Sequence, residues 1–353
     1  MTAGLLNDLL FASSLVAMTM EKGRHTMNMT STLFLLVLLW TTLEVHPFSS
    51  VSSLRRARDL VKYIVEEEEC YSKETNVPKF VDACAPNVII EDRFYPQPFN
   101  GKVGAEEYIK GRVQQRKGKG TIRIDRISDG DRACGYAWTW CCGNDEGLRG
   151  TTFVELNDRG EIVYLQEIPE PIWKPGDLTK DLLKAITSDA EPMKSEPYEK
   201  QSPAIANELC KYLFGPLQKA GGSKESVDDL MEFFDANVIY RDFNFEEAMK
   251  GPAEVRKFVE DFNFPGIEFR PLRFDDGLDS CCFTWEVVLD GAPDTIKGIS
   301  FYELDPDTRK IVYVRDVPES AIKPPILGKL ARDLRPGLGV FSPVPKGSRP
   351  GGK

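Results

Sequence analysis

The chain has 353 residues, 55 acidic against 45 basic side chains, and only two histidines. Both histidines, His25 and His46, lie in a hydrophobic N-terminal stretch that has the character of a targeting sequence. A mature chain without this stretch would lack the imidazole that a catalytic triad, a histidine general base or a histidine-ligated metal needs. The acidic balance also argues against unspecific nucleic-acid binding, which depends on clustered positive charge.

Residues 1–53 are expected to be a targeting presequence in two parts. The apolar run at 33–40 is too short to cross a bilayer, which takes about 20 apolar residues, and basic residues precede it as in a signal peptide. The serine- and arginine-rich, acid-poor stretch after Phe48 has the composition of a transit peptide. Together these features predict import into a plastid, with secretion or an endomembrane location as the alternative.

A repeat with a period of about 150 residues covers most of the remaining chain. The motif NVIIED at 87–92 matches NVIYRD at 237–242, an offset of 150, and Trp138 matches Trp285 at an offset of 147. Small differences in offset that fall in loops are typical of homologous domains. We therefore predict two copies of one domain, at 54–176 and 203–335, with a linker at 177–202 and a disordered tail at 336–353.

Each copy has helical apolar spacing first and alternating strands after it. In the first copy we expect helices at 54–70, 77–85 and 104–116 and strands at 88–95, 121–127, 133–142, 150–156 and 162–168. In the second copy we expect helices at 204–217, 226–234 and 252–262 and strands at 238–245, 267–274, 280–289, 297–304 and 311–317. The order predicts an α+β fold in which helices cover one face of an antiparallel sheet. The basic run that begins at Arg112 is expected to be a solvated helix end.

The segments NVIIED…FNGKVGAEEYI and NVIYRD…MKGPAEVRKFV, with FVELNDRGEIVYLQEIPE and FYELDPDTRKIVYVRDVPE, resemble the SnoaL-like branch of the nuclear transport factor 2-like superfamily. The likeness covers about 54–335 and is strongest to plastid-targeted plant and algal members. It implies two tandem cone-shaped domains, each with helices packed on a curved antiparallel sheet around an apolar cavity. It also implies pairing of the two domains, or a homodimer, through the convex side of the sheet. Isomerases, cyclases, dehydratases and non-catalytic modules share this fold, so the fold alone does not fix the function.

Two repeated aspartates are the candidate catalytic bases. Alternation along the first strand of each copy places Asp92 on one side with Val88 and Ile90, and Asp242 on one side with Tyr240. A carboxylate that faces an apolar cavity has a raised pKa and is fit to abstract a carbon-bound proton. The alternative is that each aspartate caps the loop or helix that follows it.

The other candidate site residues lie on later strands. The candidate ligand-binding side chains are Tyr136, Trp138, Tyr164 and Gln166 in the first copy and Tyr240, Phe283, Trp285 and Tyr313 in the second. The aromatic members could instead be ordinary core. Arg315 would pair with Asp242 and lower its pKa, which by the resemblance parallels the Asp-Arg-Asp arrangement of limonene epoxide hydrolases. The repeated acids Glu167 and Asp316 are expected to face solvent.

Two functions are compatible with this sequence. In the first, each domain binds a small hydrophobic molecule, with cofactor-free isomerase, cyclase or hydratase chemistry on an aspartate base and no metal. In the second, the chain is a non-catalytic scaffold or assembly factor whose cavities are filled by side chains. A cavity of roughly 300 Å³ or more that contains the Asp92 or Asp242 carboxylate would favour the first function.

Overall fold

The computed structural model describes residues 56–319, except for 94, 96, 117, 118, 172, 192 and 193. The expected presequence and the expected C-terminal tail lie outside the described residues. Within the described part of the chain, no helix is long and apolar enough to cross a membrane.

The first domain, as the name is used below, runs from α3 to β6. Its helical elements are α3 (Ala57–Lys62), which continues as the π-helical turn η2 (Tyr63–Glu67), then η3 (Glu74–Asn76), α4 (Val77–Ala83) and α5 (Gly101–Arg116). Its strands are β1 (Cys84–Asp92), β2 (Phe99–Asn100), β3 (Thr121–Ile127), β4 (Ala133–Cys142), β5 (Asp145–Leu156) and β6 (Ile162–Pro169).

The second domain runs from α7 to β12 and repeats this order. Its helical elements are α7 (Ala206–Tyr212), the π-helical turn η4 (Leu213–Leu217), α8 (Lys224–Met231) and α9 (Gly251–Asp261). Its strands are β7 (Phe234–Asp242), β8 (Met249–Lys250), β9 (Ile267–Phe274), β10 (Ser280–Leu289), β11 (Ile296–Leu304) and β12 (Ile311–Pro318). A further helix, α6 (Asp177–Ile186), lies in the stretch between the domains.

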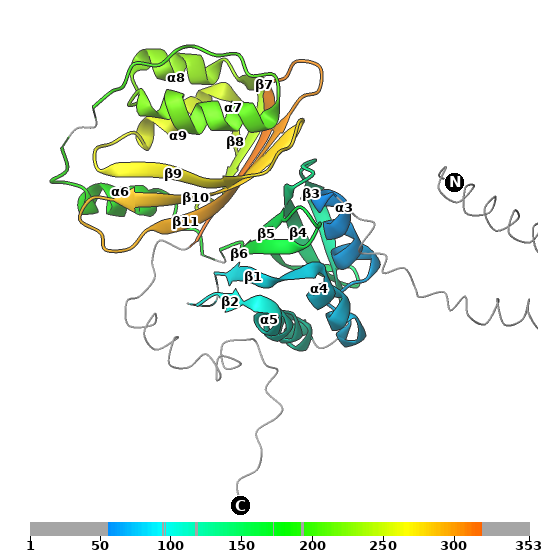
Figure 1. Cartoon of the computed structure of the whole chain (residues 1–353). Coiled ribbons are helices and arrows are strands. Elements are labelled where there is room, and N and C mark those ends of the chain that lie inside the picture. The colour runs from blue at the N-terminus through cyan, green and yellow to red at the C-terminus, as the bar shows by residue number, and fades with distance from the viewer. Residues whose placement is uncertain are drawn as a thin grey trace, which may run out of the picture. The chain divides into compact units, whose positions relative to one another are not determined.

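Each domain has one six-stranded sheet, and helices cover one of its faces. The strand orders are β2-β1-β6-β5-β4-β3 and β8-β7-β12-β11-β10-β9, and Figure 1 shows α7, α8 and α9 over the second sheet. The α+β class is therefore confirmed. The sheets are not wholly antiparallel, because β1 pairs with β6, and β7 with β12, in parallel. In the first domain the chain passes from β1 through β2 and α5 to β3, and the antiparallel strands β3 to β6 then bring β6 beside β1.

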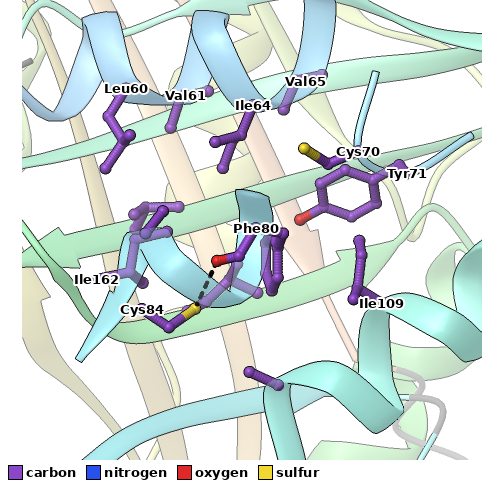
Figure 2. Packing of buried hydrophobic residues seen from close by; sticks show 14 of the residues in the cluster. Leu60, Val61, Ile64, Val65, Cys70, Tyr71, Phe80, Cys84, Ile109 and Ile162 are labelled. Carbon is purple, nitrogen blue, oxygen red and sulfur yellow. Dashed lines mark hydrogen bonds between the residues drawn. The ribbon is translucent and has the colours of Figure 1, made fainter. Parts of the chain in front are cut away.

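The layer between helices and sheet in the first domain is filled by side chains. Figure 2 shows Leu60 and Ile64 of the first helix above Phe80 and Ile109, and all four are fully buried. Tyr71 meets Phe80 edge to face, with ring centroids 5.8 Å apart. The Cys84 thiol donates a hydrogen bond to the carbonyl oxygen of Phe80 at 3.3 Å. Aromatic and aliphatic packing of this kind stabilises the domain.

The opposite faces of the two sheets contribute to a separate hydrophobic cluster. Its buried members are Ala133, Phe153, Tyr164, Ile168, Phe243, Cys282, Ile299, Phe301 and Val317, with Tyr313 packed against them. The guanidinium of Arg273 lies 4.1 Å from the centre of the Tyr164 ring, and that of Arg126 lies 3.8 Å from the Tyr313 ring. Side chains in this cluster point away from the helix-covered faces.

Candidate functional site

A cavity of about 310 Å³ lies in the second domain, on the helix-covered face of its sheet. Eight aromatic side chains contribute to its wall: Phe214, Phe234, Tyr240, Phe258, Phe262, Phe269, Trp285 and Tyr302. Helix α6 closes part of the cavity with Thr179 and Leu183, and the ion pair between Lys180 and Asp261, at 3.1 Å, ties α6 to the end of α9. This volume and this apolar wall suit a small organic molecule.

Two carboxyl groups lie side by side in the wall of this cavity. Asp242 ends β7 and Asp316 lies on β12, and the parallel register pairs these two residues directly. Residues paired in this way present their side chains on the same face of a sheet. Asp242 is only 8% exposed. Within the described residues, neither carboxylate forms an ion pair with a lysine or arginine, and no positive charge contributes to the shift of either pKa.

Hydrogen bonds hold Asp316 in a fixed orientation. Its two carboxylate oxygens accept hydrogen bonds from the hydroxyls of Tyr240 and Ser300. The Ser300 oxygen in turn accepts a hydrogen bond from the indole nitrogen of Trp285 at 2.7 Å. Gly298 makes room for this indole, because a Cβ there would lie 2.0 Å from a ring atom of Trp285. Asp242 is held more loosely, by the backbone amide of Asn244 at 2.7 Å.

The environment raises both pKa values towards neutrality. Burial raises the pKa of Asp242 to about 7, and the neighbouring charge of Asp316 contributes to the same shift. Burial raises the pKa of Asp316 to about 6, against the effect of the hydrogen bonds from Ser300 and Tyr240. Two interacting carboxyl groups titrate as a pair. The pair therefore holds a proton near neutral pH and is suited to general acid-base catalysis.

The first domain has the corresponding acid pair, and there an arginine of the same domain lies beside the two acids. Asp92 and Glu167 are paired by the parallel register of β1 and β6. Arg112 of α5 reaches them, with its Nη1 3.8 Å from Asp92 and its Nη2 in an ion pair with Glu167. Arg112 is only 3% exposed. Its guanidinium lies 5.9 Å from the ring centres of both Tyr108 and Trp138. The first domain thus supplies a cation of its own to this pair.

The same hydrogen-bonded relay supports both acid pairs. In the first domain the indole nitrogen of Trp138 donates to the Thr152 hydroxyl at 3.0 Å, and that hydroxyl donates to Glu167 at 3.2 Å. The Tyr108 hydroxyl also donates to Glu167, at 3.2 Å. The difference between the domains lies on the helix, because the offset of 150 residues places Phe262 where the first domain has Arg112.

Several predicted site residues face the helices, as alternation along the strands predicts. Asp92, Tyr136 and Trp138 are buried on that side in the first domain, where the aromatic pair belongs to the packed core. In the second domain Tyr240, Asp242 and Trp285 line the cavity, whereas Phe283 lies in the core beside it. The bond from Asn244 shows that Asp242 also caps the following loop, as the alternative interpretation expected. Ligand binding by these residues stays a prediction.

The prediction that the last strand contributes Tyr164, Gln166, Tyr313 and Arg315 to the cavities places them on the wrong face. The Arg315 Nε donates to the Thr151 hydroxyl at 2.7 Å rather than pairing with Asp242. Asp242 is in register with Asp316, so the adjacent Arg315 must point to the opposite face. The Tyr164 hydroxyl donates to Gln166 at 2.8 Å within that same opposite layer.

Two further expectations are wrong. Glu167 and Asp316 do not face bulk solvent, since Glu167 is fully buried and Asp316 lines the cavity. Arg112 is not a solvated residue at a helix end, because the buried acid pair holds its guanidinium. A signal for the two acids was present in the sequence. Both copies place an acid three residues after the tyrosine of the last strand, Glu167 after Tyr164 and Asp316 after Tyr313, so the repeat keeps an acid at this position.

Within the described part of the chain, no three or more histidine, cysteine, aspartate or glutamate side chains gather where they could hold a metal ion. The acid pair of the second domain has only two such groups.

Comparison with known proteins gives one family match. Residues 223–314 match the model of the SnoaL-like domain family, so the second domain is similar to SnoaL-like domains. Among curated protein sequences, none matches the chain significantly.

Solved structures resemble parts of the chain at low identity. A Kribbella flavida protein proposed to be a ketosteroid isomerase is 19% identical, with a TM-score of 0.27, over 34% of this chain and 81% of that one. An NTF2-like protein of unknown function from an Exiguobacterium species is 22% identical, with a TM-score of 0.27, over 32% of this chain and 98% of that one. A proposed polyketide cyclase from Sinorhizobium meliloti is 12% identical, with a TM-score of 0.26, over 31% of this chain and 93% of that one. Likeness at this level transfers no function.

The first prediction concerns the pKa of Asp242. Because the charge of Asp316 raises it, Asp316→Asn should lower the pKa of Asp242 from about 7 while burial keeps it above 3.8. Carbon-13 NMR titration of the aspartate carboxyls would measure this. Asp305, whose pKa backbone hydrogen bonds lower, serves as the internal reference. A pKa of Asp242 near 4 in the unsubstituted protein would contradict the burial argument.

The same shift sets the pH dependence of stability. Between about pH 4 and pH 7 the folded state holds more protons on Asp242 than the unfolded state, so stability falls as the pH rises through this window. Asp242→Asn removes that loss. From pH 4 to pH 8 the variant should gain about 4 kcal/mol relative to the unsubstituted protein in urea unfolding. Parallel stability curves would contradict the assignment.

The second prediction concerns Arg112. Arg112→Met leaves Asp92 and Glu167 buried without their cation, and should lower the free energy of unfolding by about 3–5 kcal/mol. The control is Lys110→Met, which removes an exposed partner of Glu106 on the same helix and should cost little. Adding Glu167→Gln to Arg112→Met should restore part of the loss. Equal effects of the two methionine substitutions would show that the buried pair contributes nothing.

Proposed function

We propose that the cavity of the second domain binds a small, mainly apolar molecule, and that the Asp242–Asp316 pair transfers a proton to or from it. The observation that carries this proposal is the presence of two adjacent carboxyl groups, without a cationic partner among the described residues, in the wall of a cavity of about 310 Å³. Placing two acids in an apolar layer destabilises the fold, and ionisable groups with perturbed pKa values cluster at functional sites.

The reaction class that fits this site is a cofactor-free proton shift, as in an isomerisation, cyclisation or hydration. A carboxyl pair with pKa values of about 6 and 7 can remove a proton from one atom and return one to another. The Tyr240 and Ser300 hydroxyls orient Asp316, which leaves the less constrained Asp242 as the better candidate base. The family match of residues 223–314 is compatible with this class.

The two domains have different roles in this proposal. The first domain fits the scaffold alternative, because Arg112 and a packed aromatic core occupy the position of the cavity. The second domain does not fit it, because it has a cavity of about 310 Å³ and its acid pair has no cationic partner among the described residues. We therefore assign ligand chemistry to the second domain and a supporting role to the first.

The test is ligand retention by the full chain. Val259 lines the cavity, so Val259→Trp should fill it and reduce the amount of any small molecule that copurifies by at least ten-fold. Leu272 is 48% exposed and lies outside the cavity, so Leu272→Trp is the matched control and should retain the molecule. Native mass spectrometry followed by solvent extraction would quantify both. Equal retention by the two variants, or no bound molecule in any of them, would count against the proposal.

A further inference from the structure

The first domain shows which chemical group satisfies the acid pair of this fold. Its guanidinium lies between Asp92 and Glu167 and over the rings of Tyr108 and Trp138. The second domain repeats the acids as Asp242 and Asp316 and repeats the rings as Phe258 and Trp285. It has Phe262 instead of the arginine. The second domain therefore repeats the two acids and the two aromatic rings that surround the cation of the first domain, but not the arginine.

The cavity wall supports the same conclusion independently of the acids. The rings of Phe258 and Phe262 lie 4.8 Å apart, and those of Phe269 and Trp285 lie 4.7 Å apart, all in the wall of the cavity. Aromatic faces attract cations by their quadrupole, most strongly where water is excluded. Asp242 contributes a side chain that is more than nine-tenths buried and faces this space.

We infer that the molecule bound in the second domain carries a positively charged nitrogen, an ammonium or a guanidinium, on an apolar body. Its nitrogen lies between Asp242 and Asp316, where the first domain places the Arg112 guanidinium between Asp92 and Glu167. This inference rests on the proposed function, since it names the class of ligand for the same cavity.

Binding of such a ligand is coupled to one proton. If the nitrogen arrives protonated, the proton that the acid pair holds near neutral pH leaves to solvent. If the nitrogen arrives as a free base, it takes the proton of the pair and becomes the ammonium. The other titratable groups around the pair are Tyr240 and Tyr302, whose pKa values burial raises well above 10, and Glu319 at the edge of the cavity. Neither tyrosine ionises near neutral pH, so the carboxyl groups carry the pH dependence.

Three matched probes with the same ring system test the inference: 2-(1-naphthyl)ethylamine, the neutral 2-(1-naphthyl)ethanol and the anionic 1-naphthylacetate. Isothermal titration calorimetry of the full chain at pH 8 should give at least ten-fold tighter binding of the amine than of the alcohol, with the anion weakest. At pH 5 the advantage of the amine should shrink, because protons then compete for the pair. Titrations near pH 6.5 in buffers of different ionisation enthalpy should show proton release on binding of the amine.

Variants assign the effect to the acid pair. Asp316→Asn should weaken the amine at least ten-fold and leave the alcohol unchanged, whereas the control Asp305→Asn, at a half-buried aspartate in the turn after β11 and outside the cavity, should change neither. Should the Asp316 variant fail to fold, the pH dependence of the unsubstituted protein still decides the question. Binding of the alcohol as tight as that of the amine at pH 8 would overturn the cationic ligand and leave the proposed function intact. Absence of binding by all three probes would overturn this inference, and together with equal retention by the two tryptophan variants it would overturn the proposed function as well.

Discussion

The pairing of the first strand of each domain with its last strand is the constraint on which the site depends. Because β7 and β12 run parallel and in register, Asp242 and Asp316 occupy neighbouring positions on the same face of the sheet. Two carboxylates brought this close in an apolar layer cannot both stay ionised at low cost. Each domain must therefore supply a cation, hold a proton or bind a ligand that resolves the conflict.

The two domains resolve it differently with the same backbone. The first domain supplies Arg112 from the covering helix, and the Arg112 guanidinium pairs with Asp92 and Glu167 within the chain. The second has a phenylalanine at the matching position, and burial raises the pKa values of its acids instead. The relay from tryptophan through a hydroxyl to the acid is kept in both.

Much of the fold could be predicted from the sequence, since the repeat, the strand order along the chain and the face of Asp242 all follow from local patterns. The face of the last strand could not be assigned in that way. Alternation along this strand gives two sets of side chains, one with Tyr313 and Arg315 and the other with Val314 and Asp316, and the sequence pattern does not say which set faces the cavity. The parallel pairing with β7 decides it. That pairing joins residues that are more than 70 apart in sequence, such as Asp242 and Asp316. The burial of Arg112 could not be predicted from the sequence either, because its partners Asp92 and Glu167 come from two strands that are distant in sequence.

The most direct test of the account is to give the second domain the cation of the first. In Phe262→Arg, the new guanidinium should reach Asp242 and Asp316, lower the pKa of Asp242 from about 7 to below its ordinary value of 3.8, and abolish binding in the cavity. Carbon-13 NMR titration of the Asp242 carboxyl would measure the first effect. A pKa of Asp242 that stays near 7 in this variant would contradict the claim that the two domains differ by one internal cation.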